Sequence, residues 1–123
     1  MLEKKTYEQH EVVDKIRHVN ATLTLNPADM CVRVSADETS GAIVVTLCNV
    51  SVMRGLFVSI VCRDADGTNT VTIQDDDESE YWAGDITMNG PGDSVLLYSD
   101  GYMWHQCCAV TTGAGTSEPP TTT

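Results

Sequence analysis

The sequence predicts an all-β protein, a jelly-roll or β-sandwich of about eight short antiparallel strands. Apolar and polar residues alternate along much of the chain, and turn-forming residues interrupt them at intervals of roughly ten to fifteen residues. The apolar set is mainly β-branched, with only one Phe, two Trp and four Tyr, and β-branched residues favour strands. An Asp-Gly pair flanked by alternating apolar residues near the C-terminal end is the strongest short-range hairpin signal.

The length and composition divide the chain into three segments. At 123 residues, the chain has the length of one domain and can fold without metal or cross-links. We expect an N-terminal arm or short helix over residues 1–18, a β-domain over 19–110 and a Gly/Pro/Thr-rich tail over 111–123. A helix in the first segment would have only a thin apolar stripe around Val12 and Ile16. An arm that orders against a partner is therefore equally expected.

Three strands are expected in the first part of the β-domain. Residues 19–25 end at a turn over 26–29, residues 30–36 end at a polar turn over 37–41, and residues 42–48 follow. Each segment alternates as a strand with one buried face does.

A hairpin is expected next, from strands over residues 56–63 and 69–74 joined across the Asp-Gly-containing turn at 64–67. Alternation would let one apolar face of each strand meet the other: Leu56, Val58, Ile60, Cys62, Val71 and Ile73. A short strand over residues 85–88 precedes the final hairpin. Because no helices separate the strands, parallel βαβ topology is excluded.

The final hairpin is expected to turn at Asp100-Gly101 in a two-residue type I′ loop, which needs positive φ at both central positions. That turn pairs Ser99 with Tyr102, and it sets the register of the remaining pairs, which are Leu97 with Trp104 and Val95 with Gln106. Val95, Leu97 and Trp104 then share a core-facing side.

The opposite side of this hairpin carries Leu96, Tyr98, Met103 and His105. This side is too apolar for a simple solvent face, and monomers seldom display contiguous apolar patches. Leu96, Tyr98 and Met103 are therefore the candidate subunit-interface residues.

The charge is strongly acidic and unevenly placed. The formal net charge is −11, all seven Lys and Arg precede Asp64, and eleven acidic residues without a base follow from there. Such a chain repels phosphate backbones and anionic membranes, so no direct nucleic-acid or membrane contact is expected. A need for solubility and a functional role are equally good explanations of this uneven charge. No run of 18 apolar residues or signal-peptide core is present.

The sequence offers no chemical site. The five cysteines are odd in number and lack C-x-x-C spacing, so reduced thiols are expected and no zinc site is indicated. The acidic run at 75–80 matches no EF-hand loop, and solvated loop acids are the simpler interpretation. Three scattered His residues and the absence of a nucleophile or phosphate-binding motif predict a protein that is not an enzyme and has no cofactor, metal or catalytic residues.

Four stretches, over residues 40–47, 54–60, 66–73 and 92–104, are strand signatures in a particular order and spacing. In that order they resemble a module widespread in bacteriophage virion proteins, among them capsid decoration proteins, head fibres and tail-fibre segments. The resemblance covers a little over half the chain. It implies a β-rich, often jelly-roll-like structural protein that is commonly trimeric.

The sequence departs from that module in two places. Leu47 is followed by Cys48 where the module typically has Leu-Pro, and Leu96 and Met103 stand where polar residues are common. The second departure suggests that this face is buried against another subunit.

The resemblance implies a capsid decoration, or cement, protein that binds the outside of the assembled head and stabilises it. Its partners would be the major capsid protein and itself, as a homotrimer. Its place would be the outer capsid surface of the virion, after synthesis in the host cytoplasm. An alternative is a tail-fibre, head-fibre or spike module that recognises host-surface glycans, with Trp82 and Tyr81 as contacts. A third is an intracellular β-sandwich unrelated to phage.

Overall fold

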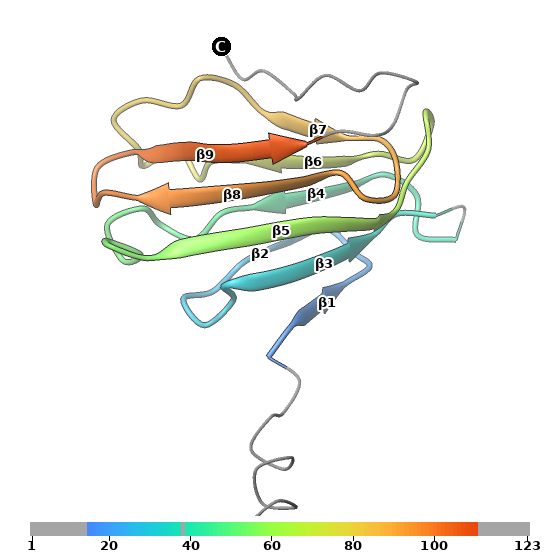
Figure 1. Ribbon diagram of the computed structural model, residues 1–123, viewed down its shortest axis with the longest axis horizontal. Coiled ribbons are helices and arrows are strands. Elements are labelled where there is room, and N and C mark those ends of the chain that lie inside the picture. Colours follow the sequence, from blue (N-terminus) through green and yellow to red (C-terminus); the bar gives the residue numbers. More distant parts are fainter. Residues whose placement is uncertain (1–14, 38, 111–123) are drawn as a thin grey trace, which may run out of the picture.

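The computed structural model describes residues 15–37 and 39–110, and all of its regular structure is β-strand (Figure 1). The nine strands, in chain order, are β1 (Arg17–Val19), β2 (Leu23–Thr24), β3 (Cys31–Ser35), β4 (Ile43–Thr46), β5 (Phe57–Asp64), β6 (Val71–Gln74), β7 (Ile86–Met88), β8 (Ser94–Ser99) and β9 (Trp104–Val110). The all-β prediction is confirmed. The expected N-terminal arm and C-terminal tail lie almost wholly outside the described residues.

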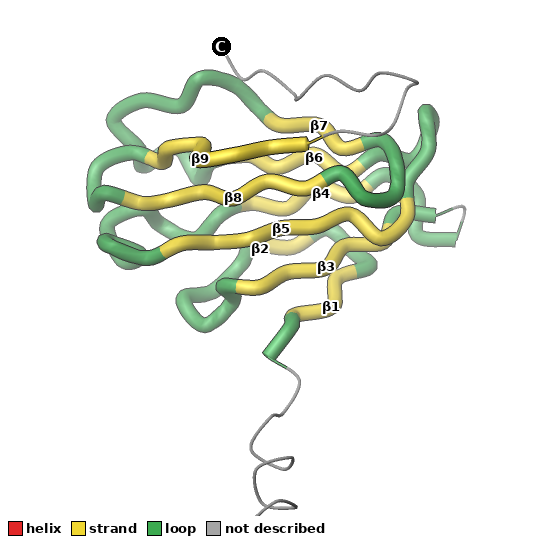
Figure 2. The backbone as a smooth tube through the Cα atoms, viewed as in Figure 1, coloured by secondary structure: helices red, strands yellow, loops and turns green. Residues whose placement is uncertain are grey.

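The strands form two mixed sheets that enclose one hydrophobic core. The larger sheet has the order β1-β3-β5-β8-β9 and the smaller one β2-β4-β6-β7. In Figure 2 the two sets of strands lie one behind the other, and the core cluster draws residues from both. Buried residues alternate with exposed ones along β5 and with half-buried ones along β8, because successive side chains on a strand point to opposite faces. Each sheet therefore has one face in the core.

The first six strands pass back and forth between the two sheets. The odd strands β1, β3 and β5 lie side by side in the larger sheet, and β2, β4 and β6 lie side by side in the smaller one. Whenever the chain re-enters a sheet, the new strand runs in the same direction as the previous strand of that sheet, so neighbouring strands are parallel. Parallel neighbours need a crossover connection, usually a helix. Here a strand of the opposite sheet is that crossover, and the expectation of antiparallel strands throughout is wrong.

The hairpin expected over residues 56–74 is also wrong. β5 and β6 belong to different sheets, and the turn at 64–67 carries the chain across the core. Both edges of β5 are occupied, one by β3 in parallel and the other by β8 in antiparallel register, so β6 has no free edge of β5 to pair with. Val71 and Ile73 are fully buried, and they reach the core from the facing sheet.

The last three strands are antiparallel to their neighbours. β7 pairs with β6, β8 with β5, and β9 with β8. β5 is thus the junction between a parallel part and an antiparallel part of the larger sheet. This arrangement leaves the outward faces of β5, β8 and β9 next to one another.

Candidate functional site

The outer face of the larger sheet carries an unusual amount of apolar surface. Its exposed or half-buried side chains form three rows across β5, β8 and β9: Phe57, Tyr98 and His105; Ser59, Leu96 and Cys108; and Val61, Ser94 and Val110. Side chains opposite one another on neighbouring strands are close enough to interact. We call this set the outer apolar face.

The first row is a line of rings. The ring centroids of Phe57 and Tyr98 are 4.9 Å apart at an interplanar angle of 47°, and those of Tyr98 and His105 are 6.1 Å apart. Tilted pairs at such distances are favourable for aromatic rings. Phe57 is nevertheless 48% exposed, so the row offers a rigid, solvent-facing aromatic surface.

Two of the three residues predicted for a subunit interface lie on this face. Leu96 and Tyr98 are half-buried on β8, between the exposed side chains of β5 and β9. Met103 is in the turn before β9 and lines a cavity instead. Sequence reasoning missed Phe57 and Val61 because β5 was assigned to another hairpin. It missed Val110 because the pairs expected for the final hairpin stop at Gln106, whereas β9 extends to Val110.

The β1–β3 end of the same outward side is basic. A cleft there is lined by His18, Arg33, Ser35, Asp37 and Arg63, among others. Arg63 Nη1 donates to Ser35 Oγ at 3.4 Å. In a chain with net charge −11, this cleft is a local concentration of positive charge that would attract carboxylates.

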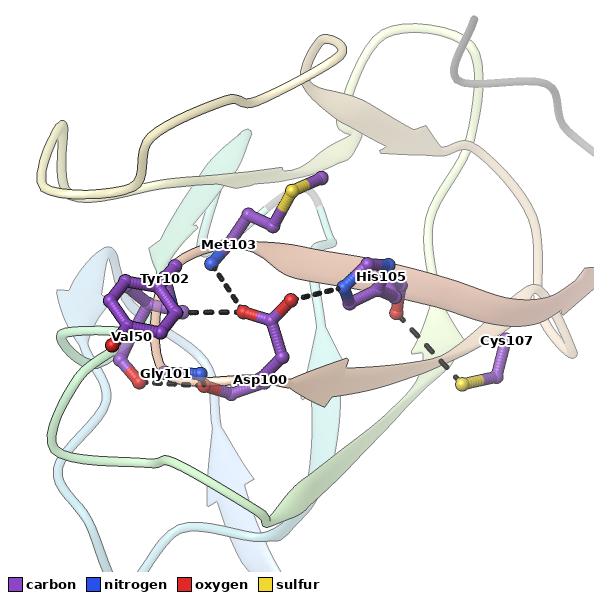
Figure 3. Close-up of polar contacts among 8 residues, drawn as sticks. Val50, Asp100, Gly101, Tyr102, Met103, His105 and Cys107 are labelled. Carbon is purple, nitrogen blue, oxygen red and sulfur yellow. Dashed lines mark hydrogen bonds and ion pairs between the residues drawn. The ribbon is translucent and has the colours of Figure 1, made fainter.

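The turn between β8 and β9 has four residues, 100–103, and the expected two-residue turn is wrong (Figure 3). The Asp100 carboxylate accepts the backbone N–H groups of Tyr102 and Met103, each at 2.8 Å. These bonds hold two extra residues in the loop, as Asp side chains commonly do in turns. Ser99 therefore pairs with Trp104 in place of Tyr102.

The core residues of this hairpin lie on the predicted face although the register differs from the prediction. The structure pairs Leu97 with Gln106 and Val95 with Ala109, where Trp104 and Gln106 were expected. The partner of Leu97 shifts by two residues, which keeps the face. The partner of Val95 shifts by three, because the pairing slips by one further residue between Leu96 and Leu97, as at a β-bulge. Val95, Leu97 and Trp104 are all buried, so their assignment to the core is confirmed.

The turn is fixed to the rest of the protein on two sides. Ser99 Oγ donates to the carbonyl oxygen of Val50 at 2.6 Å and accepts the N–H of Gly101 at 3.1 Å. Gly101 has φ +95°, and a Cβ atom there would lie 2.6 Å from Arg54 Nε. The positive φ favours glycine at this position, and a Cβ atom would also require the Arg54 side chain to move.

Asp100 also joins the turn to β9. Its Oδ2 lies 2.8 Å from His105 Nε2 (Figure 3). The hydrogen bond from His105, followed by those from the backbone N–H groups of Met103 and Tyr102, lowers the pKa of Asp100 to about 2. The carboxylate thus remains charged through most of the acidic range.

A cavity of about 210 Å³ opens beside this hairpin. Its walls include Tyr81 and Trp82 from the preceding loop and Met103, Trp104 and Gln106 from the hairpin. Trp82 packs against the core cluster, and its Nε1 donates to Asp85 Oδ1 at 2.9 Å. Trp82 is therefore a half-buried wall of the cavity.

Neither the acidic run nor the cysteines form a three-ligand metal site or a disulfide among the described residues. Asp75 is buried, and its carboxylate accepts the Asp77 N–H and the Ser79 hydroxyl. Within residues 15–37 and 39–110, no three His, Cys, Asp or Glu residues are grouped to hold a metal ion. All five cysteines are free, and burial raises the pKa of the Cys62 thiol to about 11, which keeps it protonated and unreactive.

Searches against protein-family models, curated proteins and solved structures found no match to this chain. None of the residues that the structure describes forms a helix of the length and hydrophobicity that a membrane span requires.

Proposed function

We propose that the chain is a bacteriophage capsid decoration protein that trimerises through its outer apolar face and binds the outside of the assembled head. The single observation that carries the proposal is this face, with Phe57 at 48% and Val110 at 48% exposed around a rigid ring pair. A set of this kind is typical of a protein–protein contact, in which aromatic side chains supply most of the binding energy.

Within this proposal the fold is a β-sandwich. Two sheets that share one core are common to sandwiches and jelly rolls. Jelly rolls are built from antiparallel Greek keys, whereas β1, β3 and β5 are parallel in the larger sheet and β2, β4 and β6 are parallel in the smaller one. The sandwich is therefore the better of the two assignments.

The two ends of the outward side suit different partners. The apolar end is proposed as the contact between copies. The basic cleft with Arg33 and Arg63 is proposed to meet acidic side chains of the major capsid protein, because complementary charge favours specific encounter. Binding only to the assembled shell stabilises it by mass action, by about 2.7 kcal/mol per site when free protein is a hundredfold above Kd.

The test is a matched pair of charge insertions, Phe57→Glu and Val52→Glu. Val52 is 56% exposed and lies in the loop before β5, outside the face. The parent and Val52→Glu should have the mass of three chains by light scattering and should pellet with capsids that lack the protein. Phe57→Glu should be monomeric and should remain in the supernatant. Trimeric, capsid-bound Phe57→Glu, or a monomeric parent that does not pellet with capsids, would refute the proposal.

The terminal segments are proposed to strengthen attachment to the shell. Arg17 belongs to β1, and its Nη1 donates to Asp29 Oδ2 at 3.0 Å. A truncation should therefore stop at residue 14 so that this ion pair and β1 are kept. Removal of 1–14 or 111–123 should leave the melting temperature unchanged and reduce pelleting. Full pelleting of both truncated forms would assign attachment to the β-domain alone.

A further inference from the structure

Cys107 and Cys108 are neighbours on β9, and both are exposed free thiols. On a regular strand two neighbouring side chains point to opposite faces, so one of the pair should point toward the core. The pairing of β8 with β9 explains the exception. Leu96 pairs with Cys108, whereas the next residue, Leu97, pairs with Gln106. Cys107 is therefore the extra residue of a β-bulge, in which two residues of one strand lie opposite one residue of its neighbour.

The bulge leaves both thiols on the outward side of the larger sheet. Gln106, just before the pair, is half-buried and lines the cavity beside the hairpin. Ala109, just after it, is buried in the core cluster. The two cysteines between them are exposed, Cys108 as a member of the outer apolar face. The Cys107 thiol donates to the carbonyl oxygen of His105 at 4.0 Å (Figure 3).

The spacing of the two residues suits a shared bridging atom better than a direct disulfide. No described peptide bond is cis, so the Cα atoms of neighbouring residues are about 3.8 Å apart. Disulfides usually join Cα atoms roughly 4.4 to 6.8 Å apart, and a shorter spacing strains the bond. An ion with two metal–sulfur bonds of about 2.3 Å at a tetrahedral angle holds its sulfur atoms roughly 3.8 Å apart. That separation matches the spacing of the two residues.

The described residues add no third protein ligand to this pair. Cys31, the other exposed cysteine, lies on β3. Three strand spacings of about 4.8 Å separate β3 from β9 in the sheet, so one ion cannot bind Cys31 and the pair. Cys48 and Cys62 are buried. Within residues 15–37 and 39–110, no three His, Cys, Asp or Glu are grouped to hold a metal ion.

We propose that Cys107 and Cys108 chelate one thiophilic divalent ion of the Zn²⁺ and Cd²⁺ class, for which thiolate sulfur is a preferred ligand. Binding breaks two S–H bonds, forms two metal–sulfur bonds and releases two protons to the solvent. No oxidation state changes, so the step needs no oxidant. Two coordination positions are left for water or another small ligand. Both protein ligands come from one chain, so the site does not depend on the trimer or on the decoration function.

The test is a titration of Cd²⁺ into the reduced full chain, because Cd²⁺ bound to thiolates absorbs in the ultraviolet. Excess Mg²⁺ occupies carboxylates, which give no such absorption with Cd²⁺. The absorption should saturate at one Cd²⁺ per chain, and added Zn²⁺ should abolish it. Because Cys108 belongs to the outer apolar face, the titration is run on the parent and on Phe57→Glu. The mass of the parent tests the trimer, whereas saturation in either form supports the metal site.

Substitutions identify the ligands. Cys107→Ser and Cys108→Ser each remove one thiolate and should weaken Cd²⁺ binding by about a hundredfold, because the second contact is no longer intramolecular. Cys31→Ser removes a matched exposed thiol and should bind as the parent does. Cys107→Ser combined with Gln106→Cys keeps two cysteines near the bulge but places one on the inner side, and it should bind as weakly as Cys107→Ser alone. Near-ultraviolet circular dichroism checks that each variant is folded.

Three results would overturn the proposal. The first is no saturable absorption from either the parent or Phe57→Glu. The second is saturation at half an ion per chain with a doubled mass by light scattering, which would mean that the ion joins two chains. The third is binding that Cys31→Ser abolishes, or that Cys107→Ser and Cys108→Ser leave unchanged, which would place the ion elsewhere.

Discussion

The loop around Asp66 and the loop around Asp100 have the same hydrogen bonds and different places in the fold. The Asp66 carboxylate accepts the N–H groups of Thr68 and Asn69, each at 2.7 Å, as the Asp100 carboxylate does with the two equivalent residues, each at 2.8 Å. In both loops the Asp N–H also donates to the carbonyl three residues later. Yet the Asp66 loop crosses between the sheets, and the Asp100 loop joins two neighbours in one sheet.

The difference lies in the strands that enter the two loops. β5 enters the Asp66 loop with both of its edges occupied, so the chain must leave the sheet. β8 enters the Asp100 loop with one edge free, and β9 takes it. Local turn chemistry therefore reverses the chain, and the availability of a strand edge decides whether the flanking strands pair.

The two loops should differ most in how much stability is lost when the first residue after the turn is replaced by alanine. Trp104 is buried there in one loop, whereas Thr70 is half-buried in the other. Trp104→Ala should lower the free energy of unfolding by about 3 to 5 kcal/mol, as loss of a buried large aromatic does. Thr70→Ala should lower it by about 0.5 kcal/mol. Urea denaturation of both variants measures this, and equal midpoints would contradict the assignment of Trp104 to the core.

Each loop has a glycine after its Asp, and the two should respond oppositely to alanine. Gly101 has positive φ, and a Cβ atom there would displace the Arg54 side chain, whereas a Cβ atom at Gly67 meets nothing within 4 Å. Gly101→Ala should destabilise by about 1 to 3 kcal/mol through strain. Gly67→Ala should be neutral or stabilise by up to about 1 kcal/mol, because it restricts the unfolded chain. Thermal melts compare them, and a tolerated Gly101→Ala would show that this turn relaxes easily.

The substitution His105→Gln should change the pKa of Asp100 and leave the pKa of Asp66 as it is. Backbone N–H groups of Asn69 and Thr68 lower the pKa of Asp66, whereas the hydrogen bond from His105 is the main cause of the lowered pKa of Asp100. Carboxyl NMR titration of the variant should show the Asp100 pKa rising from about 2 toward 3.8 and the Asp66 pKa unchanged.

The stability that Asp100 contributes has a defined pH window. Because its folded pKa is depressed, the contribution is complete above the ordinary value of 3.8 and disappears as the pH falls through about 2. His105→Gln should shrink the acid-dependent loss of stability over that window. An unchanged Asp100 pKa in the variant would mean that the turn N–H groups alone lower it.

The smallest expected effect on the free energy of unfolding is at the second residue after each Asp, which is Tyr102 in one loop and Thr68 in the other. The Arg54 guanidinium carbon lies 4.9 Å from the Tyr102 ring centroid, and exposed pairs of this kind contribute about 0.5 to 1 kcal/mol. Tyr102→Ala should lower the free energy of unfolding by about that amount, and Thr68→Ala should leave it within about 0.5 kcal/mol. Denaturation of Arg54→Ala and of the double variant gives the coupling, and no coupling would exclude the Arg54–Tyr102 contact.

Strand positions and core residues could be predicted because they depend on a local period of two. The predicted strands over 30–36, 42–48 and 85–88 contain β3, β4 and β7. The core position of Trp104 was right even though its partner was wrong, because a two-residue slip preserves the face. The parallel coil could not be predicted, because edge occupancy at β5 depends on β8, which follows much later in the chain.

Only parts of the candidate site could be predicted from the sequence. Leu96 and Tyr98 were recognised because they interrupt an expected polar face. Phe57 joins them only through the long-range pairing of β5 with β8. The cavity depends on residues 81–84 lying beside β9, and no pattern within one segment reveals such a contact.

The position of β5 between its two neighbours has a consequence during synthesis. β3 precedes β5 in the chain, but β8 begins at Ser94, 30 residues after β5 ends at Asp64. At about 5 to 20 residues per second of translation, the edge of β5 that β8 will cover stays open for roughly 2 to 6 seconds after its last residue is added. We expect the nascent chain to need protection from aggregation at that edge, and a pause in translation between β5 and β8 to lower the yield of folded protein.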